Sequence, residues 1–259
     1  MKKYRFLLTE ESGYSKNAIK IYSKLGKVFN NNNYINKIDE INVLVVKLNF
    51  NLNVNYLNKF KNLEFILTST TGTTHIDIDY CKKKLIKIIK LESNDKELNK
   101  VTSTAELTIG MILVIVRNLH TAYFDFVKKK KNSRNHYIGR SLSNLSIGII
   151  GYGRIGKMVS KMAKVFKMDV FIYEIDKKKI PLNSKLKFVT SMKEIFIKSD
   201  IISIHIPYIY KNQHIINKKL FALTKNKPYL INTSRGELIN DEDLFWALKN
   251  QKLSGAALD

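Results

Sequence analysis

The stretch Leu145–Asp176, which reads "LSIGIIGYGRIGKMVSKMAKVFKMDVFIYEID", decides the fold of this chain. It holds an apolar run, the pattern G-x-G-x-x-G at Gly151, Gly153 and Gly156, a helical pattern, and a second apolar run that ends in an acid. This order is typical of a strand, turn, helix and strand that together bind a dinucleotide. The alternative is a unit of the same shape that needs its glycines for packing alone.

Each glycine of the pattern has a physical reason: the first permits a tight turn, the second lets the backbone approach a pyrophosphate, and the third lets helix and strand pack closely. The amides of Arg154 and Ile155 would face the phosphates at the positive end of the helix. Glu174 follows Gly156 by 18 residues. A carboxylate there accepts ribose hydroxyls and repels a 2′-phosphate, which favours NAD over NADP. Lys177–Lys179 lie close by in the sequence and would soften that preference.

Short apolar runs alternate with helical stretches along the chain, and this alternation indicates parallel sheets built from βαβ units. We therefore expect an α/β protein with a flavodoxin-like domain at residues 1–98 and a Rossmann-like dinucleotide domain at residues 99–259. The expected strands are residues 4–8, 42–48, 64–68, 85–91, 146–150, 169–173, 201–206, 229–232 and 253–258.

The segment that follows residue 99 predicts one long helix, "STAELTIGMILVIVRNLHTAYFDFVKKKK". Ser103 and Glu106 have the spacing of a capping box, and Lys128–Lys131 would close the helix at its negative end. Its middle is apolar nearly all round, so it must be buried within this chain or against a second one. We predict a homodimer through the Ser103–Val127 helix.

Composition bounds the remaining possibilities. Apolar residues make up 44% of the chain and charged residues 26%, as in folded domains. The net charge of +23 comes from 39 lysines against only 6 arginines, spread along the chain. Nucleic-acid surfaces favour arginine forks and clustered patches, so no specific nucleic acid is expected, although a polyanion-binding protein remains an alternative.

The setting that we expect is cytoplasmic. The single cysteine, Cys81, cannot form an internal disulfide. The apolar part of the N-terminus is too short for a signal peptide, and the run "LTIGMILVIV" is about half the length that a membrane span needs. We expect no membrane and no metal.

Four motifs, "GYGRIG", "SDIISIHIPY", "INTSRGELINDEDLFWAL" and "SGAALD", follow one another in an order and spacing that resemble the D-isomer-specific 2-hydroxyacid dehydrogenases. That family includes phosphoglycerate, glycerate and D-lactate dehydrogenases. The segments "LTSTTGTTHIDID" and "TSTAELTIGMILVIVRN" match its earlier blocks. The resemblance implies a two-domain, NAD-dependent oxidoreductase that transfers hydride between nicotinamide and C2 of a 2-hydroxy or 2-oxo acid.

The resemblance also implies site residues. Backbone amides at Thr71 and Gly72 would hold the substrate carboxylate. The cofactor would contact the glycine turn, the end of the second strand, the "HIP" turn, the "TSR" turn and the last residue. By number, these cofactor-binding positions are Gly151, Gly153, Arg154, Ile155, Gly156, Glu174, His205, Ile206, Pro207, Thr233, Ser234 and Asp259.

Arg235 is the predicted catalytic residue. A 2-oxo acid presents a carboxylate beside a carbonyl oxygen, and a guanidinium can hydrogen-bond to it as a planar fork while keeping its charge. Facing the nicotinamide, Arg235 would orient the acid and stabilise negative charge that grows on the carbonyl oxygen. The alternative is an ion pair of Arg235 with Glu237 or Asp241 at the start of the next helix.

The proton donor and acceptor of this family is a histidine held by a glutamate, and both lie beyond the aspartate that matches Asp259. The family's last helix, which returns to the first domain, also lies beyond that aspartate, so the resemblance implies that residues 1–98 lack it and that the NAD-binding domain is incomplete at its C-terminus. We therefore expect either a fragment of a longer enzyme or a shortened relative, with activity about 10²- to 10⁴-fold lower for lack of the acid–base group. His75 matches no proton acceptor of the family, and His205 belongs to the cofactor turn. A non-catalytic NAD-binding module is the alternative function.

Overall fold

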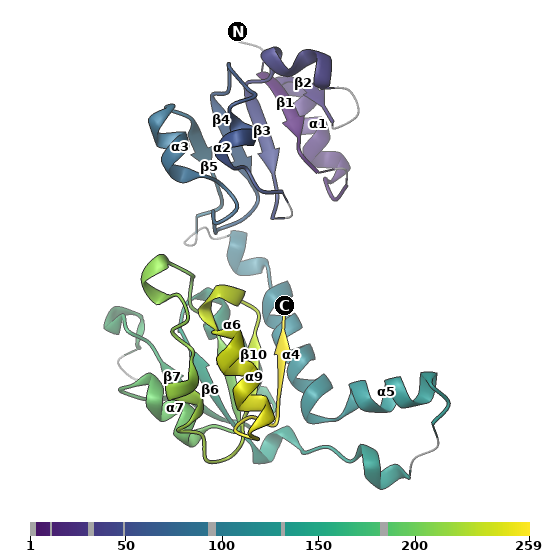
Figure 1. Cartoon of the computed structure of the whole chain (residues 1–259), viewed down its shortest axis with the longest axis vertical. Coiled ribbons are helices and arrows are strands. Elements are labelled where there is room, and N and C mark those ends of the chain that lie inside the picture. Colours follow the sequence, from purple (N-terminus) through teal and green to yellow (C-terminus); the bar gives the residue numbers. More distant parts are fainter. Residues whose placement is uncertain are drawn as a thin grey trace. The chain divides into compact units, whose positions relative to one another are not determined.

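The computed structural model describes residues 4–10, 12–30, 34–48, 50–92, 97–130, 133–181 and 186–259. The chain divides into two compact units, Met1–Leu98 and Asn99–Asp259. Each unit has a central sheet whose paired strands are all parallel, with helices packed on it (Figure 1). The α/β class with two parallel sheets, predicted from the sequence, is therefore confirmed.

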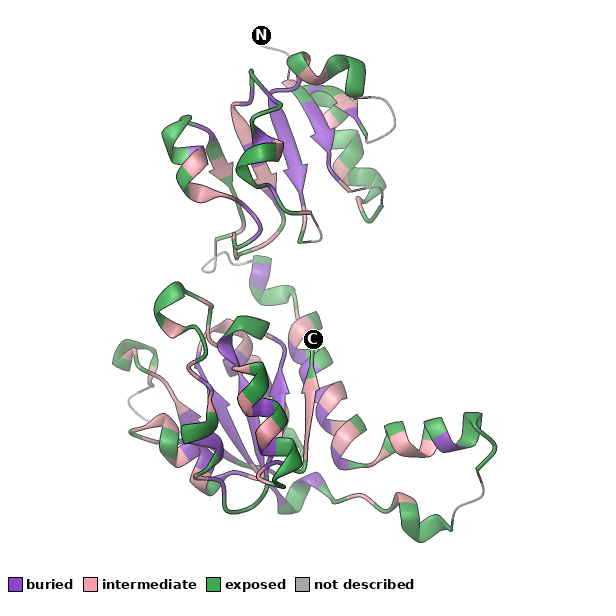
Figure 2. Ribbon diagram, in the orientation of Figure 1, coloured by how far each residue is buried: buried purple, intermediate pink, exposed green. Residues whose placement is uncertain are grey.

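The first unit has the strand order β2-β1-β3-β4-β5, the order of flavodoxin-like folds. Its central strands are apolar on both faces because helices cover both, and they run through the buried part of the unit (Figure 2). The strands are β1 (Tyr4–Leu8), β2 (Gly26–Phe29), β3 (Val43–Val46), β4 (Phe65–Thr68) and β5 (Lys87–Ile89). The helices are α1 (Lys16–Leu25), η1 (Ile35–Glu40), α2 (Val54–Leu57) and α3 (Ile78–Lys83), and η2 (Glu97–Lys100) crosses the boundary between the two units.

The second unit has the order β11-β10-β9-β6-β7-β8, which is the Rossmann order with its switch point between β6 and β9. Its strands are β6 (Ser146–Ile150), β7 (Asp169–Tyr173), β8 (Lys187–Phe188), β9 (Ile201–Ile204), β10 (Tyr229–Asn232) and β11 (Gly255–Leu258). Its α-helices are α4 (Ser103–Val116), α5 (Leu119–Val127), α6 (Arg154–Val165), α7 (Met192–Lys198), α8 (Lys218–Phe221) and α9 (Asp241–Lys249). Its short 3-10 turns are η3 (Arg134–Tyr137), η4 (Leu142–Asn144), η5 (Lys177–Lys179), η6 (Tyr210–Asn212) and η7 (Gly236–Leu238).

Two apolar cores cover the two faces of the second sheet. One joins α4 and α6 to the strands through buried residues such as Ile112, Val159 and Ile147. The other joins α7, α8 and α9 to the opposite face through residues such as Phe196 and Phe221. Strands that are covered on both faces in this way read as continuous apolar runs, which is why the sequence predicts them well.

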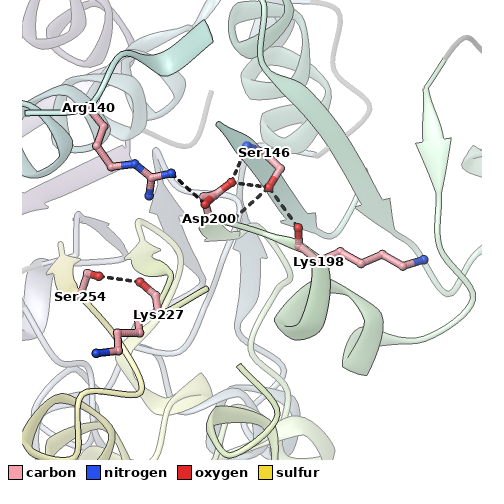
Figure 3. Close-up of polar contacts among 6 residues, drawn as sticks. All are labelled: Arg140, Ser146, Lys198, Asp200, Lys227 and Ser254. Atoms are coloured by element: carbon pink, nitrogen blue, oxygen red, sulfur yellow. Dashed lines mark hydrogen bonds and ion pairs between the residues drawn. The ribbon is translucent and has the colours of Figure 1, made fainter. Parts of the chain in front are cut away.

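Polar groups tie the second sheet together at the amino ends of its strands (Figure 3). Asp200, just before β9, accepts hydrogen bonds from the amide of Ser146 at 3.0 Å, from its hydroxyl at 2.7 Å and from Arg140 at 3.1 Å. Burial alone would raise the pKa of Asp200, but these donors outweigh it and leave that pKa lowered. Ser254, before β11, donates to the carbonyl of Lys227 at 2.6 Å. This end of the sheet is thus occupied by the protein's own polar groups.

The structure corrects the prediction of one long helix. α4 ends at Val116, Asn118 adopts the left-handed region with φ 53°, and α5 begins at Leu119. The capping box is wrong as well, because Thr102 precedes the helix without a capping hydrogen bond to the backbone, and its hydroxyl donates to the Glu106 carboxylate instead. Lys131, the last residue of the predicted helix, lies outside the described residues. Strands β2 and β8 were not predicted.

One helical stretch, Glu97–Val116, is by length and composition long and apolar enough to cross a membrane. At 20 residues it is longer than the apolar run considered in the sequence. Core helices of soluble proteins meet the same two criteria. Within this stretch α4 buries Ala105, Ile109 and Ile112 in the core of the second unit, so one of its faces packs on the protein itself.

Candidate functional site

Most of the predicted cofactor residues lie along one edge of the second sheet. Because all its strands are parallel, their carboxyl ends meet at this edge, and ligands of open α/β sheets bind there at the switch point. β6 leads into the glycine turn, β7 into Glu174, β9 into His205, β10 into Thr233 and β11 into Asp259. The fold therefore brings together five segments that are far apart in the sequence.

Two of the three glycines are required by the protein's own packing. Gly151 has φ 97°, and a Cβ at that position would lie 2.6 Å from the carbonyl oxygen of His205. A Cβ on Gly156 would lie 2.0 Å from the carbonyl oxygen of Gly151. These two glycines let α6 start directly against β6 and the β9 turn.

Gly153 is different, because a Cβ there would meet no protein atom within 4 Å. It is the N-cap of α6, which begins at Arg154 without a side-chain capping bond. The helix therefore presents its positive end and its first amides beside open space, which is the arrangement that binds a phosphate. Packing alone accounts for Gly151 and Gly156 but not for Gly153, so the turn fits a dinucleotide pyrophosphate.

Glu174 contacts the glycine turn itself. One oxygen of its carboxylate accepts a hydrogen bond from the amide of Tyr152 at 2.8 Å, and the other accepts from the amide of Asp176 at 2.9 Å. Its side chain is only 6% exposed. The carboxylate thus joins the end of β7 to the turn after β6, while the second lone pairs of its oxygens can still accept ribose hydroxyls.

The turn after β9 is held from two sides. The amide of His205 donates to the carbonyl of Ile150 at 2.8 Å, and its ring Nε2 lies 2.8 Å from the Ser203 hydroxyl. Burial lowers the pKa of His205 to about 4, so the imidazole is neutral near pH 7. The carbonyl of Ile206 accepts a hydrogen bond from the Ser234 hydroxyl at 2.5 Å. This bond connects the "HIP" turn to the turn that carries Arg235.

Asn232 shapes the turn after β10, and the sequence analysis did not single it out. Its side chain accepts from the amide of Ser234 at 3.0 Å and donates to the carbonyl of Arg235 at 2.9 Å, and the residue is 2% exposed. An asparagine at the end of an apolar strand is a signal for such a turn, since its amide imitates a backbone turn. The carbonyl of Asn232 also accepts from the amide of Asp259 at 3.0 Å.

The Arg235 guanidinium makes no ion pair with Glu237 or Asp241, all three being described residues. Its Nη1 donates to the carbonyl of Ser234 at 2.8 Å. Beside it, the hydroxyls of Thr233 and Thr108 lie 2.8 Å apart, which fixes the turn against α4. The structure therefore does not support the alternative in which Arg235 serves to pair with those acids.

The two predicted substrate residues belong to the first unit, in the loop after β4. Thr71 is exposed, and the carbonyl of Gly72 accepts a hydrogen bond from the Thr70 hydroxyl at 2.6 Å. His75 is buried in the same loop, with its Nε2 3.4 Å from the Thr68 hydroxyl. Among the described ranges no group of three or more His, Cys, Asp or Glu residues is placed to hold a metal ion.

The fold and the glycine turn define a dinucleotide-binding α/β protein, and comparison with known proteins gives the family. Residues 109–259 match the model of the D-isomer specific 2-hydroxyacid dehydrogenase, NAD binding domain. The chain is 31% identical over 248 residues to a D-3-phosphoglycerate dehydrogenase of Methanocaldococcus jannaschii, covering 93% of this chain and 46% of that protein. It is 31% identical over 222 residues to a hydroxypyruvate reductase of Thermotoga maritima, covering 86% and 70%.

Among solved structures, the chain is similar to a D-lactate dehydrogenase from Aquifex aeolicus complexed with NAD and lactic acid. The TM-score is 0.78 at 29% identity, and the match covers 98% of this chain and 76% of that one. The chain belongs to the D-isomer-specific 2-hydroxyacid dehydrogenase family and carries its NAD-binding domain, so the cofactor predicted from the sequence, NAD, is confirmed. It spans about half the length of the first curated relatives that it matches, 46% and 41%.

The lowered pKa of His205 predicts a loss of stability in mild acid. The folded state binds this proton only near pH 4, whereas an unfolded histidine binds it near about pH 6.5. Unfolding therefore takes up a proton between these values. The stability that the neutral ring confers is complete above about pH 6.5 and falls toward pH 4, by no more than about 3 kcal/mol.

Urea unfolding measures this loss, because Trp246, the only tryptophan, lies in the second unit and reports on it. Between pH 6.5 and 4 the free energy of unfolding should fall less steeply in His205→Asn than in the wild type. His120→Asn, a change at an exposed histidine, is the matched control and should keep the wild-type slope. Equal slopes for the wild type and His205→Asn would contradict the prediction.

Proposed function

We propose that this chain belongs to an NAD-dependent oxidoreductase acting on a 2-hydroxy or 2-oxo acid. Its second unit would bind the cofactor and its first unit the substrate. The observation that supports this is that the open space beside Gly153, called here the Gly153 cradle, and the turn that carries Arg235 lie at the same carboxyl edge of one sheet. Family membership and the names of the relatives, which are dehydrogenases and reductases of 2-hydroxy and 2-oxo acids, point the same way. The first unit, with Thr71 and Gly72, is the proposed substrate domain.

Each segment at the sheet edge binds a different part of the cofactor in this proposal. Backbone amides at the start of α6 bind the pyrophosphate, and Glu174 accepts the ribose hydroxyls. The turns after β9 and β10 line the nicotinamide end, and the hydrogen bond from the Ser234 hydroxyl to the Ile206 carbonyl joins them. Asp259, whose backbone N–H donates a hydrogen bond to the carbonyl of Asn232, contacts the carboxamide. When bound, NAD supplies the group that accepts or donates hydride.

Arg235 is the proposed catalytic residue. Asn232 fixes the backbone on both sides of Ser234, and the guanidinium is free of ion pairs with the acids that follow it. A planar fork can hold the substrate carboxylate and the neighbouring oxygen at once, and its permanent charge stabilises the oxygen as negative charge develops. Thr233, two residues before Arg235, is buried, and a charge acts more strongly on a developing oxyanion where water is excluded.

His205 is not the proton donor. Burial lowers its pKa to about 4, and its Nε2 lies against the Ser203 hydroxyl, so it is neutral and engaged near pH 7. A general acid works best when its pKa is near the working pH. We assign no proton-transfer residue among the described residues, and we propose that the chain alone turns over substrate slowly or not at all.

We also propose a homodimer through α4 and α5. Within its unit, α5 extends away from the sheet (Figure 1), and its apolar side chains are exposed, including Tyr123 at 72% and Phe126 at 81%. Its one buried residue is an acid, Asp125. Exposed apolar area of this kind marks an interaction surface, and a second copy of the chain offers the same surface in return.

The proposed setting is the cytoplasm, without a membrane. The thiol of Cys81 is buried and free, and α4 packs one face on the sheet of its own unit. A small-molecule acid, rather than nucleic acid, is the proposed substrate. The lysine excess then acts as a solvated surface.

The cradle at Gly153 gives the first test of this function. Gly153→Ala places a methyl group where the pyrophosphate would approach, and we expect the Kd for NADH to rise at least about tenfold, or about 1.4 kcal/mol. Gly110→Ala in α4 is the matched control, because a Cβ there also meets nothing within 4 Å. Calorimetry should show wild-type affinity for the control. Absence of NADH binding by the folded wild type would overturn the proposal.

Arg235 gives the second test, in the whole gene product. Arg235→Lys keeps the charge but loses the fork, so we expect turnover of a 2-hydroxy acid to fall by about 10- to 100-fold, with the Kd for NADH changed less than about twofold. Arg134→Lys, at an exposed position, is the control. Equal losses of turnover and NADH affinity would show that Arg235 serves the cofactor. A wild type that binds NADH and oxidises no 2-hydroxy acid would be a non-catalytic NAD-binding module.

Placing a charged side chain on the exposed apolar surface of α5 tests the proposed dimer. Sedimentation at micromolar concentration should give a dimer for the wild type and a monomer for Phe126→Asp, since the substitution would bury a carboxylate in the interface. Phe245→Asp, at an equally apolar residue of α9 that is 67% exposed, is the control and should remain dimeric. A monomeric wild type would contradict the dimer but not the chemistry.

A further inference from the structure

A carboxylate at the position of Glu174 ordinarily excludes a 2′-phosphate by charge repulsion. In this protein the negative charge of the Glu174 carboxylate is already partly balanced by hydrogen-bond donors. Its two oxygens accept hydrogen bonds from the amides of Tyr152 and Asp176, at 2.8 and 2.9 Å. With 6% of its side chain exposed, little of its charge faces solvent. A carboxylate repels an incoming phosphate less when donors already bind both of its oxygens.

A lysine adds positive charge at the same place. The Nζ of Lys179 lies 4.0 Å from the Glu174 carboxylate and 3.9 Å from that of Asp176. The Lys179 side chain is 47% exposed, and both distances are at the limit of an ion pair, so these contacts hold it weakly. The ammonium can therefore turn to another anion at little cost.

The local charge is positive overall. Residues 174–179 contain two acids, Glu174 and Asp176, and three lysines, Lys177, Lys178 and Lys179, which sum to a formal charge of +1. The three lysines form η5 directly after the end of β7. A doubly charged phosphate at the ribose end would therefore be met by a net cationic segment rather than by an isolated carboxylate.

We propose that the ribose end of this site accepts an adenosine 2′-phosphate, with Lys179 as the residue that binds it, so that the protein takes NADP(H) as well as NAD(H). The proposal rests on the proposed cofactor site. Glu174 Oε1 is 4.0 Å from the Lys179 ammonium. A ribose hydroxyl that is hydrogen-bonded to Glu174 would lie close to both groups. A phosphate on that hydroxyl would therefore be within reach of the flexible lysine side chain. Lys179 is thus the residue that determines whether NADP(H) is accepted. Glu174 also holds the glycine turn through the amide of Tyr152.

Titrations of NADH and NADPH into the full chain test this, with nicotinamide fluorescence or calorimetry as the readout. The wild type should bind NADPH within about tenfold of NADH. Lys179→Gln should raise the Kd for NADPH at least about tenfold and that for NADH less than about twofold. Lys187→Gln is the matched control, because Lys187 pairs with Asp169 at the amino end of β7, away from the ribose end. It should change neither Kd.

The outcomes separate the two proposals. NADH binding with no selective loss of NADPH in Lys179→Gln overturns this inference and leaves the proposed function intact. Equal losses of NADPH affinity in Lys179→Gln and Lys187→Gln also overturn it, because the lysines would then act as a general field. Failure of the wild type to bind either nucleotide overturns the proposed cofactor function itself.

Discussion

The close approach of α6 to β6 is the constraint on which the site depends. The position of a Cβ on Gly156 lies 2.0 Å from the Gly151 carbonyl oxygen, and that of a Cβ on Gly151 lies 2.6 Å from the His205 carbonyl oxygen. Three segments meet there only because two side chains are absent. The result is a helix whose uncapped, positive end opens at the sheet edge beside Gly153. The other candidate groups of the second unit follow strands that end at the same sheet edge.

The sequence predicts the central strands well and the edges poorly. Buried parallel strands are apolar throughout, so runs such as "SIGII" stand out. β2, "GKVF", follows α1 without an intervening residue, and β8 has only two residues, so neither leaves a clear pattern. The break between α4 and α5 carries no glycine or proline. It depends on Asn118 adopting the left-handed region, which asparagine tolerates more readily than most residues.

The site was predictable where it depends on side-chain type at a strand end, and not where it depends on backbone partners. Family likeness names Arg235 and Glu174, but not the amide of Tyr152 that binds Glu174. Nor does it indicate that Asn232 holds both Ser234 and Arg235. These partners are set by which turns the fold places side by side. A sequence pattern records the residue that faces the ligand better than the residue that positions it.

The lysine-rich composition bears on which groups of the proposed site could select a ligand. A chain with a net charge of +23, almost all from lysine, surrounds any anion with diffuse positive potential, which raises encounter rates without choosing a ligand. In the proposed site, the glycine turn would select its ligand through backbone amides, which a lysine-rich composition cannot alter. In the proposed site, Arg235 would select its ligand through a rigid guanidinium fork, which lysine cannot supply. At the ribose end of the proposed site, selection between NAD and NADP would depend on the balance between the Glu174 carboxylate and the neighbouring ammonium groups, so there the lysine bias of the chain would bear directly on the choice of cofactor.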